Sequence, residues 1–265
     1  MSKRLTKEEL RKLIDTSIKK LNSLLVDLEN DTDNESSIKR AGLLSYWIIE
    51  YVKMLRSEKT FDSTKLLKYN RGDIVCVNFG YRIGSELGGR HFAFVLDNYN
   101  SMKSGVLTVV PLTSKKDSYK NNCYCHELQH GLYELHKNKL KTLLYECRDE
   151  LNYLNSHIET NKDDEQFNLL AGRIKKLSEK NEEAQNLQKS IFKLKDGTVA
   201  NLGQIATISK IRILNPKQSS DSLNKIKIAP VDLDIVNQKL KYLYLPKKQT
   251  DDDETFNAFK EGLNS

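Results

Sequence analysis

The sequence has 265 residues, 38% of them hydrophobic and 30% charged, which is enough to form a real core and corresponds to one or two domains. No apolar run approaches the ~20 residues of a membrane helix, and the N-terminus lacks the apolar stretch of a secretory signal, so we expect a cytoplasmic protein. The 43 basic and 36 acidic residues give a formal charge of +7, which permits nucleic-acid binding without requiring it.

Residues 1–66 are predicted to form a helical hairpin. Thr6 and Glu9 make a capping-box pattern, in which each side chain satisfies a free backbone amide at the start of a helix. Leucine and isoleucine then recur at helical spacing, and the turn-forming residues 30–34 separate this apolar stripe from a second one.

From residue 69 the pattern changes to that of short strands. Runs at 73–79, 91–96 and 106–110 are rich in β-branched and aromatic residues, with glycine-rich turns between them. Two further runs follow at 198–202 and 205–208. Short strands of this kind favour a small barrel or sandwich.

A second helical hairpin, similar to a coiled coil, is predicted at residues 132–192, between the strand runs. It either packs on the first hairpin as a bundle or forms a dimer arm. One more helix is expected around 231–243. The chain ends in an acidic tail, 246–265, which is either solvated or lies over a basic groove in place of RNA phosphates.

Residues suited to RNA cleavage gather around the first three strand runs. Cleavage by the RNA's own 2′-hydroxyl needs one group to remove the 2′ proton, another to protonate the leaving 5′ oxygen, and donors for the charged phosphorane. Histidine suits proton transfer near neutral pH. An ordinary glycine-rich hairpin with polar surface residues would have a similar composition. The candidates are Gly84, Ser85, Glu86, Arg90, His91, Thr113 and Ser114.

Three segments, in this order along the chain, resemble the MazF/PemK family of toxins. Residues 71–98, with Arg71-Gly72-Asp73, Gly84-Ser85-Glu86 and Gly88-Gly89, resemble the first half of the family's domain. Residues 109–114 resemble its next strand with the active-site end, and residues 202–208 resemble a later strand. The resemblance assigns 67–131 and 193–245 to the toxin domain, leaving both helical hairpins outside it.

The resemblance implies an SH3-like β-barrel of the MazF/PemK/CcdB type, so the predicted fold class is α+β: this barrel with an N-terminal and an inserted helical hairpin. It implies the toxin of a type II toxin-antitoxin system, an endoribonuclease that cleaves single-stranded mRNA to a 2′,3′-cyclic phosphate with no metal or other cofactor. The implied partners are a cognate antitoxin and a second copy in a homodimer. DNA would be contacted only through the antitoxin complex.

In that family, an arginine after the Gly-Gly loop and a threonine at the end of the later strand carry catalysis. The threonine corresponds to Thr113, whereas the arginine position holds His91, with Arg90 one place earlier. Either His91 is the acid or base and Arg90 stabilises charge, or the departure marks a non-catalytic member. The residues expected to bind the RNA strand are Gly84, Ser85, Glu86, Ser114 and Gln204.

Other functions remain open at this point. The same barrel occurs in toxins that poison gyrase, so a non-catalytic toxin acting on a protein target is one alternative, and an RNA-binding adaptor is another. Residues 123–130 contain two cysteines and two histidines and so suggest zinc. However, C-x-C is a poor chelating spacing, and the alternation around Tyr124 fits a strand with Cys123 and Cys125 on one face better.

Overall fold

The computed structural model describes residues 5–31, 34–119, 121–157, 164–191 and 197–246. The chain divides into two compact units, Met1–Phe61 and Asp62–Ser265. The predicted acidic tail lies, apart from its first residue, outside the described residues. No helix in the described ranges combines the length and the apolar character needed to cross a bilayer.

The first unit contains α1 (Lys7–Asn30) and α2 (Glu35–Ser57), followed by a short 3-10 turn. The predicted capping box is confirmed: Thr6 Oγ1 accepts from the Glu9 amide at 3.2 Å, and Glu9 accepts from the Thr6 amide at 2.8 Å. No described residue of α1 is buried, and Ser37 is the one buried residue of α2. The apolar stripe of α1 is therefore largely exposed, that of α2 is exposed or half-buried, and the packing of the two helices as a hairpin stays a prediction.

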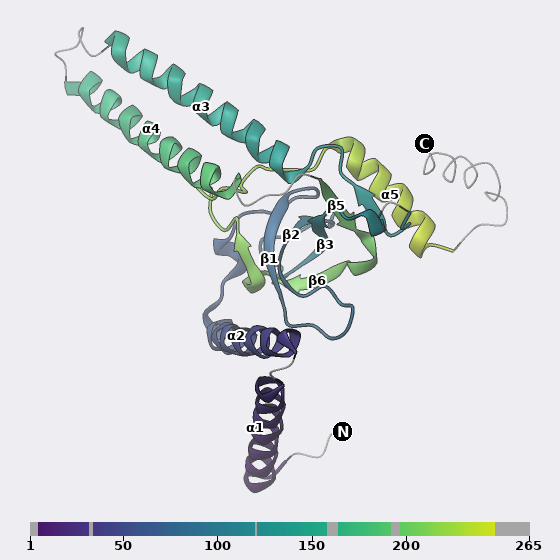
Figure 1. Cartoon of the computed structure of the whole chain (residues 1–265). Coiled ribbons are helices and arrows are strands. Elements are labelled where there is room, and N and C mark those ends of the chain that lie inside the picture. Colours follow the sequence, from purple (N-terminus) through teal and green to yellow (C-terminus); the bar gives the residue numbers. More distant parts are fainter. Residues whose placement is uncertain (1–4, 32–33, 120, 158–163, 192–196, 247–265) are drawn as a thin grey trace. The chain divides into compact units, whose positions relative to one another are not determined.

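The second unit is built on an antiparallel sheet (Figure 1). Its strands are β1 (Ile74–Gly80), β2 (Gly89–Val95), β3 (Val106–Ser114), β4 (Cys125–Glu127), β5 (Thr198–Asn201), β6 (Ala206–Ser209) and β7 (Ile213–Asn215). The order is β4-β5-β3-β2-β1-β7, and β6 pairs with the first half of β3. The α+β class is confirmed. Within the described residues the end strands β4 and β7 do not pair, so closure into an SH3-like barrel stays a prediction.

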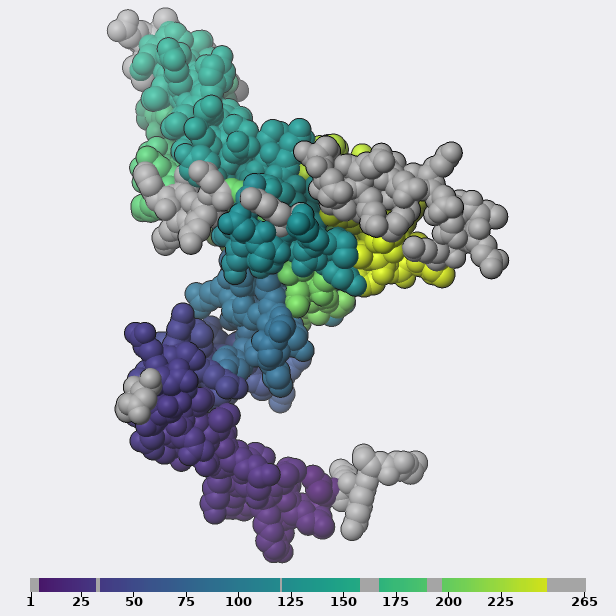
Figure 2. All heavy atoms as spheres, turned by 45° about the vertical axis from the view of Figure 1, so that its right-hand side comes forward, coloured from purple at the N-terminus to yellow at the C-terminus, as the bar shows by residue number. Residues whose placement is uncertain are grey.

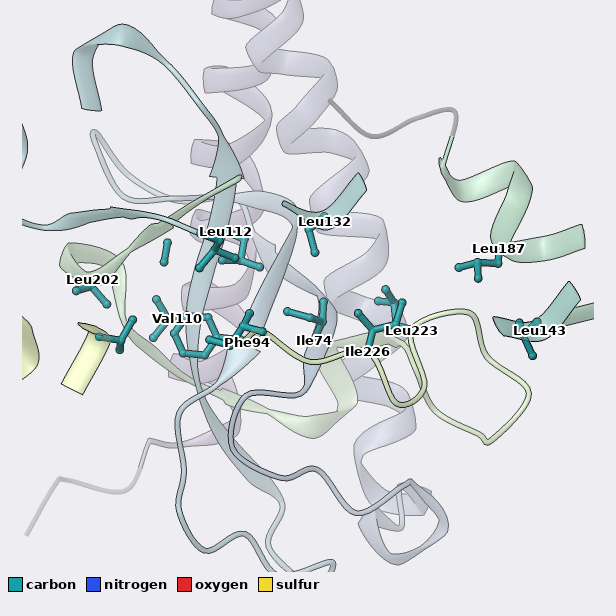
Figure 3. Packing of buried hydrophobic residues seen from close by; sticks show 14 of the residues in the cluster. Ile74, Phe94, Val110, Leu112, Leu132, Leu143, Leu187, Leu202, Leu223 and Ile226 are labelled. Atoms are coloured by element: carbon teal, nitrogen blue, oxygen red, sulfur yellow. The ribbon is translucent and has the colours of Figure 1, made fainter. Parts of the chain in front are cut away.

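Successive side chains of β1, β2 and β3 point to opposite faces of the sheet and so contribute to two hydrophobic cores. The strand-side core contains Val75, Val77, Ala93, Val95, Leu107, Val109 and Ile208, together with Tyr69, Phe79 and Ile213. The helix-side core is formed on the other face by Ile74, Phe94, Val110 and Leu112 with apolar residues of the helices, including Leu132, Leu143, Leu187 and Val236 (Figure 3). The buried parts of β1, β2 and β3 are therefore covered on both faces.

The helices α3 (Leu132–His157) and α4 (Asp164–Ile191) leave the sheet after β4 and return to it before β5, and we call this pair the arm. They lie side by side in Figure 1. Three ion pairs join them in antiparallel order: Lys139–Glu183 at 2.6 Å, Glu146–Lys180 at 2.9 Å and Glu150–Arg173 at 3.0 Å. The two predicted helices are confirmed, and residues 158–163 between them lie outside the described residues.

The last described helix, α5 (Pro230–Tyr244), confirms the helix expected around 231–243. Figure 2 shows its yellow atoms beside teal atoms of the middle of the chain. Buried Lys239 donates to the Cys125 carbonyl at 2.6 Å, and Tyr244 donates to the Leu202 carbonyl at 2.7 Å. Because the Lys239 ammonium is buried, its pKa lies below the ordinary value for lysine. These bonds fasten α5 to β4 and to the end of β5.

Candidate functional site

Arg90 and His91 are adjacent in β2 and therefore face opposite sides of the sheet. His91 shares the face of the strand-side core, where its ring meets the Phe79 ring edge-on with 6.5 Å between centroids. Arg90 pairs in register with Asn78 and lies toward Cys76 on the other face. Burial raises the pKa of the Cys76 thiol, and the Arg90 charge partly opposes that shift. The structure thus does not bring the two predicted catalytic residues together.

Thr113 shares the face of His91. The described β2–β3 pairing ends with Ala93 opposite Pro111, and His91 and Thr113 are each two residues beyond that pair, on the same face. Along its other edge β3 pairs with β5 from Leu112 onward, and there Thr113 lies opposite Val199. His91 and Thr113 are both half-buried, so an imidazole and a hydroxyl lie at the rim of the strand-side core.

The loop between β1 and β2 is held in place by Gln204. The Gln204 side chain accepts from the Leu87 amide at 3.1 Å and donates to the Ser85 carbonyl at 3.2 Å. Glu86 lies 3.7 Å from the Arg82 guanidinium, and Gly84 has φ of +61°, which a residue with a side chain rarely adopts. Four of the predicted RNA-binding residues are therefore close together: three lie in this loop, and the fourth, Gln204, binds it.

Ser114 does not share the face of Thr113. It ends β3, is exposed, and pairs in register with Thr198 of β5. The Thr198 hydroxyl accepts from the Leu132 amide at 2.9 Å, at the first residue of α3. Ser114 therefore lies toward the start of the arm, on the face opposite the hydroxyl of Thr113.

A charged pair on the face of Thr113 was missed in the sequence. Lys115 Nζ lies 2.7 Å from Glu127 Oε1, and both side chains are exposed. Glu127 ends β4 in the same cross-strand row as Thr113, with Val199 of β5 between them. No local pattern predicts this pair, because the strand between the two residues, β5, follows the whole arm in the sequence.

His126 is occupied by a contact with α5. Its Nε2 lies 2.8 Å from Asp232 Oδ1, and the buried Asp232 also accepts from the Gln129 amide at 3.0 Å. Burial lowers the pKa of His126, and its bond to Asp232 opposes that shift. Cys125 lies in β4 as expected of a strand, whereas Cys123 precedes it. In the part of the chain that the structure describes, no group of three or more His, Cys, Asp or Glu side chains is placed to hold a metal.

His136 is a buried imidazole at the start of the arm. Its Nδ1 lies 2.7 Å from the Leu132 carbonyl, and its ring meets Phe92 of β2 edge-on at 6.2 Å between centroids. Its Nε2 has no hydrogen-bond partner among the described residues. Burial lowers the pKa of His136. The ring packs against the strand that carries His91, although it lies on the opposite face.

Comparison with protein families matches residues 70–145 to the PemK-like, MazF-like toxin of type II toxin-antitoxin systems. The matched range holds β1–β4 and the first part of α3, and with them His91, Thr113 and the Lys115–Glu127 pair. The resemblance inferred from the sequence is confirmed over this range; its later segment, 193–245, lies outside the match. No curated protein matches the chain.

Proposed function

We propose that this chain, which carries a PemK/MazF-like toxin domain at residues 70–145, is the toxin of a type II toxin-antitoxin system. In this proposal a cognate antitoxin restrains it, the active unit is a homodimer, and DNA is contacted only through the antitoxin complex. The observation that carries the proposal is the domain match, because its range includes both candidate catalytic residues of the shared face.

The proposed activity is metal-independent cleavage of single-stranded RNA. His91 is half-buried beside Phe79 and suits proton transfer near neutral pH. The Thr113 hydroxyl, on the same face of the sheet, suits donation to a phosphate oxygen as negative charge develops. The 2′-hydroxyl gives its proton to His91, its oxygen attacks phosphorus, and the bond to the 5′-oxygen breaks. The 5′-oxygen takes up a proton from solvent, which leaves a 2′,3′-cyclic phosphate and a 5′-hydroxyl. Arg90 has no part in this step, because it faces the other side of β2.

The test is cleavage of a long single-stranded RNA in EDTA, with end-group analysis of the products. Wild type is compared with His91→Ala and Thr113→Val, and with Arg90→Ala as the control on the opposite face. We expect both site variants to lose roughly 100-fold or more in rate and the control to keep most of it. Products with 3′-phosphate and no cyclic intermediate at any time would contradict the proposed step.

A second candidate is a non-catalytic toxin that acts on a protein target such as gyrase. The observation that favours it is His91 at the position where the resembling family has arginine. Folded wild-type protein that binds its protein target and leaves RNA intact would support this candidate and contradict the nuclease.

A further inference from the structure

The face shared by His91 and Thr113 lacks the cation assigned from the sequence. A phosphorane carries more negative charge than the phosphodiester from which it forms, so a nuclease without a metal needs a positive group near the scissile phosphate. Arg90, which the sequence suggested as the residue that stabilises this charge, lies on the opposite face of β2 with Asn78 and Cys76. Lys115 is a cation on the correct face.

We propose that Lys115 contacts the scissile phosphate during cleavage and that Glu127 is the residue that positions it. This inference rests on the proposed nuclease function and assigns to it a charged group outside the residues predicted from the sequence. Lys115 would be a catalytic residue, whereas Glu127 would act only through Lys115.

Strand geometry supports the placement of Lys115. Alternate residues of a strand share a face, so Lys115 follows Thr113 on the same side, about 6–7 Å further along the chain. The Lys115 amide donates to the Gly197 carbonyl at 3.3 Å, which continues the β3–β5 ladder by one step. Lys115 therefore has the orientation of a strand residue although it follows the end of β3.

Glu127 approaches Lys115 from the other side of β5. The row Thr113–Val199–Glu127 crosses three strands, and paired residues of antiparallel strands project to the same face. The Glu127 carboxylate lies 2.7 Å from the Lys115 ammonium. The carboxylate thus holds the long, flexible lysine side chain across β5, on the side of β3 that faces away from β2.

Gly197 leaves space for the stem of Lys115. A Cβ atom at position 197 would lie 2.9 Å from Lys115 Cβ and 3.2 Å from its Cδ, and the φ of Gly197 is +75°. Contacts this short require a shift of the lysine stem or of the backbone. The bare backbone of Gly197 thus leaves room for the stem of Lys115.

Stability alone does not account for the pair. The Lys115 and Glu127 side chains are 44% and 48% exposed, and ion pairs this open contribute little to folding. The Lys115 ammonium can exchange one oxygen partner for another without leaving the surface. A phosphate oxygen of bound RNA is the partner that the proposed reaction supplies.

The test compares kcat and KM for RNA cleavage by Lys115→Gln, Lys115→Arg and Glu127→Gln, with Lys116→Gln as the matched control. Lys116 is the next lysine along the chain and lies over the Tyr119 ring, 5.8 Å from its centroid. We expect Lys115→Gln to lower kcat by roughly 100-fold, as for loss of one group that stabilises the transition state. Lys115→Arg should retain much of the rate, Glu127→Gln should lose less than Lys115→Gln, and the control should match wild type.

The double variant Lys115→Gln/Glu127→Gln tests the role of Glu127. If Glu127 acts only through Lys115, the double variant is no slower than Lys115→Gln alone. Losses that multiply would overturn the positioning role and make Glu127 an independent acid or base.

The remaining outcomes separate this inference from the proposed function. Wild-type cleavage with normal kcat in Lys115→Gln would overturn the inference and leave the nuclease intact. A raised KM with unchanged kcat would also overturn it, because Lys115 would then only attract RNA. A lowered melting temperature that accounts for the lost activity would show a structural role instead. Intact RNA with folded wild type would remove both proposals together.

Discussion

The helices of the first unit and the helices of the arm have the same helical spacing of apolar residues in the sequence. They differ greatly in how many of those apolar side chains are buried. Both pairs carry leucine and isoleucine at helical spacing. No described residue of α1 is buried, whereas the arm buries Leu143, Cys147, Leu154, Ala184 and Leu187. Helical periodicity predicts that a helix has an apolar face; it does not predict what covers that face.

The arm differs from α1 because its helices pack against each other and against the residues of the second unit that cover the sheet. Leu143 and Leu187 belong to the helix-side core together with Leu223 and Ile226 (Figure 3). Lys139 pairs with Glu183 and also donates to the carbonyls of Ser222 and Asn224, at 3.1 and 2.8 Å. The base of the arm is thus a continuation of the helix-side core. Because the arm is anchored in this core and α1 is not buried, substitutions in the two regions should differ in their effect on the free energy of unfolding.

The largest effect is expected from Leu187→Ala. Leu187 is fully buried, so truncation leaves a cavity and should lower the free energy of unfolding by about 2–5 kcal/mol. Urea unfolding followed by circular dichroism measures the loss. The sole tryptophan, Trp47, lies in α2, so its fluorescence reports on the first unit and serves as an internal control. A fluorescence transition that moves by the same amount would contradict independent unfolding of the two units.

Removal of the Lys139 charge should cost less, about 1–2 kcal/mol, because Glu183 and two carbonyls lose a charged donor. Lys139→Met retains most of the stem and isolates the charge. Lys180→Met is the matched control, since Lys180 pairs with Glu146 in a more open position and should matter less. Equal losses in urea unfolding would mean that contact with the sheet unit adds nothing at Lys139.

Acid should destabilise the base of the arm through His136. Burial lowers its pKa in the folded protein below the ordinary value of 6.5, so the unfolded chain binds a proton more readily. The stability from neutral His136 is complete above the unfolded pKa and is lost as pH falls from about 6.5 toward the folded pKa, by at most about 1.4 kcal/mol per pH unit.

His136→Leu should therefore flatten the pH dependence of the unfolding free energy below about pH 6.5. His126 also has a lowered pKa and remains in this variant, so a shallower slope persists. Urea unfolding at several pH values measures both slopes. An unchanged slope in His136→Leu would show that His136 does not titrate differently in the folded and unfolded chains.

The smallest effect is expected in α1. Ile18 is 61% exposed, and its truncation to alanine should change the free energy of unfolding by less than about 0.5 kcal/mol. Trp47 fluorescence during urea unfolding measures this change in the first unit. A loss as large as that of Leu187→Ala would mean that the apolar stripe of α1 is covered in solution.

Much of the fold could be predicted from the sequence because its elements are encoded locally. The capping box, the two arm helices, α5 and the first three strands all follow from periodicity and turn residues. The strand β7, Ile213–Asn215, could not be predicted, because three residues carry no measurable alternation. Its pairing with β1 is decided by packing against the strand-side core instead.

The candidate site was only partly predictable. Thr113 and His91 were found through family resemblance, and the opposite orientation of Arg90 follows from the two-residue period of a strand. Lys115 and Glu127 had no such signal. They meet because β5 lies between β3 and β4, and the position of β5 depends on where the arm returns the chain.

The place of the arm also bears on how the chain folds. Cys125 pairs with Asn201 although the whole arm separates them along the sequence. Closing so long a loop by diffusion slows folding, whereas helix pairs form quickly from contacts close in sequence. Once α3 and α4 associate, the two ends of the arm are close together, since a Cβ atom on Gly131 would lie 3.7 Å from the Gly197 amide nitrogen, and the two short strands are already neighbours. We expect the arm to form first and β4 to pair with β5 rapidly afterwards.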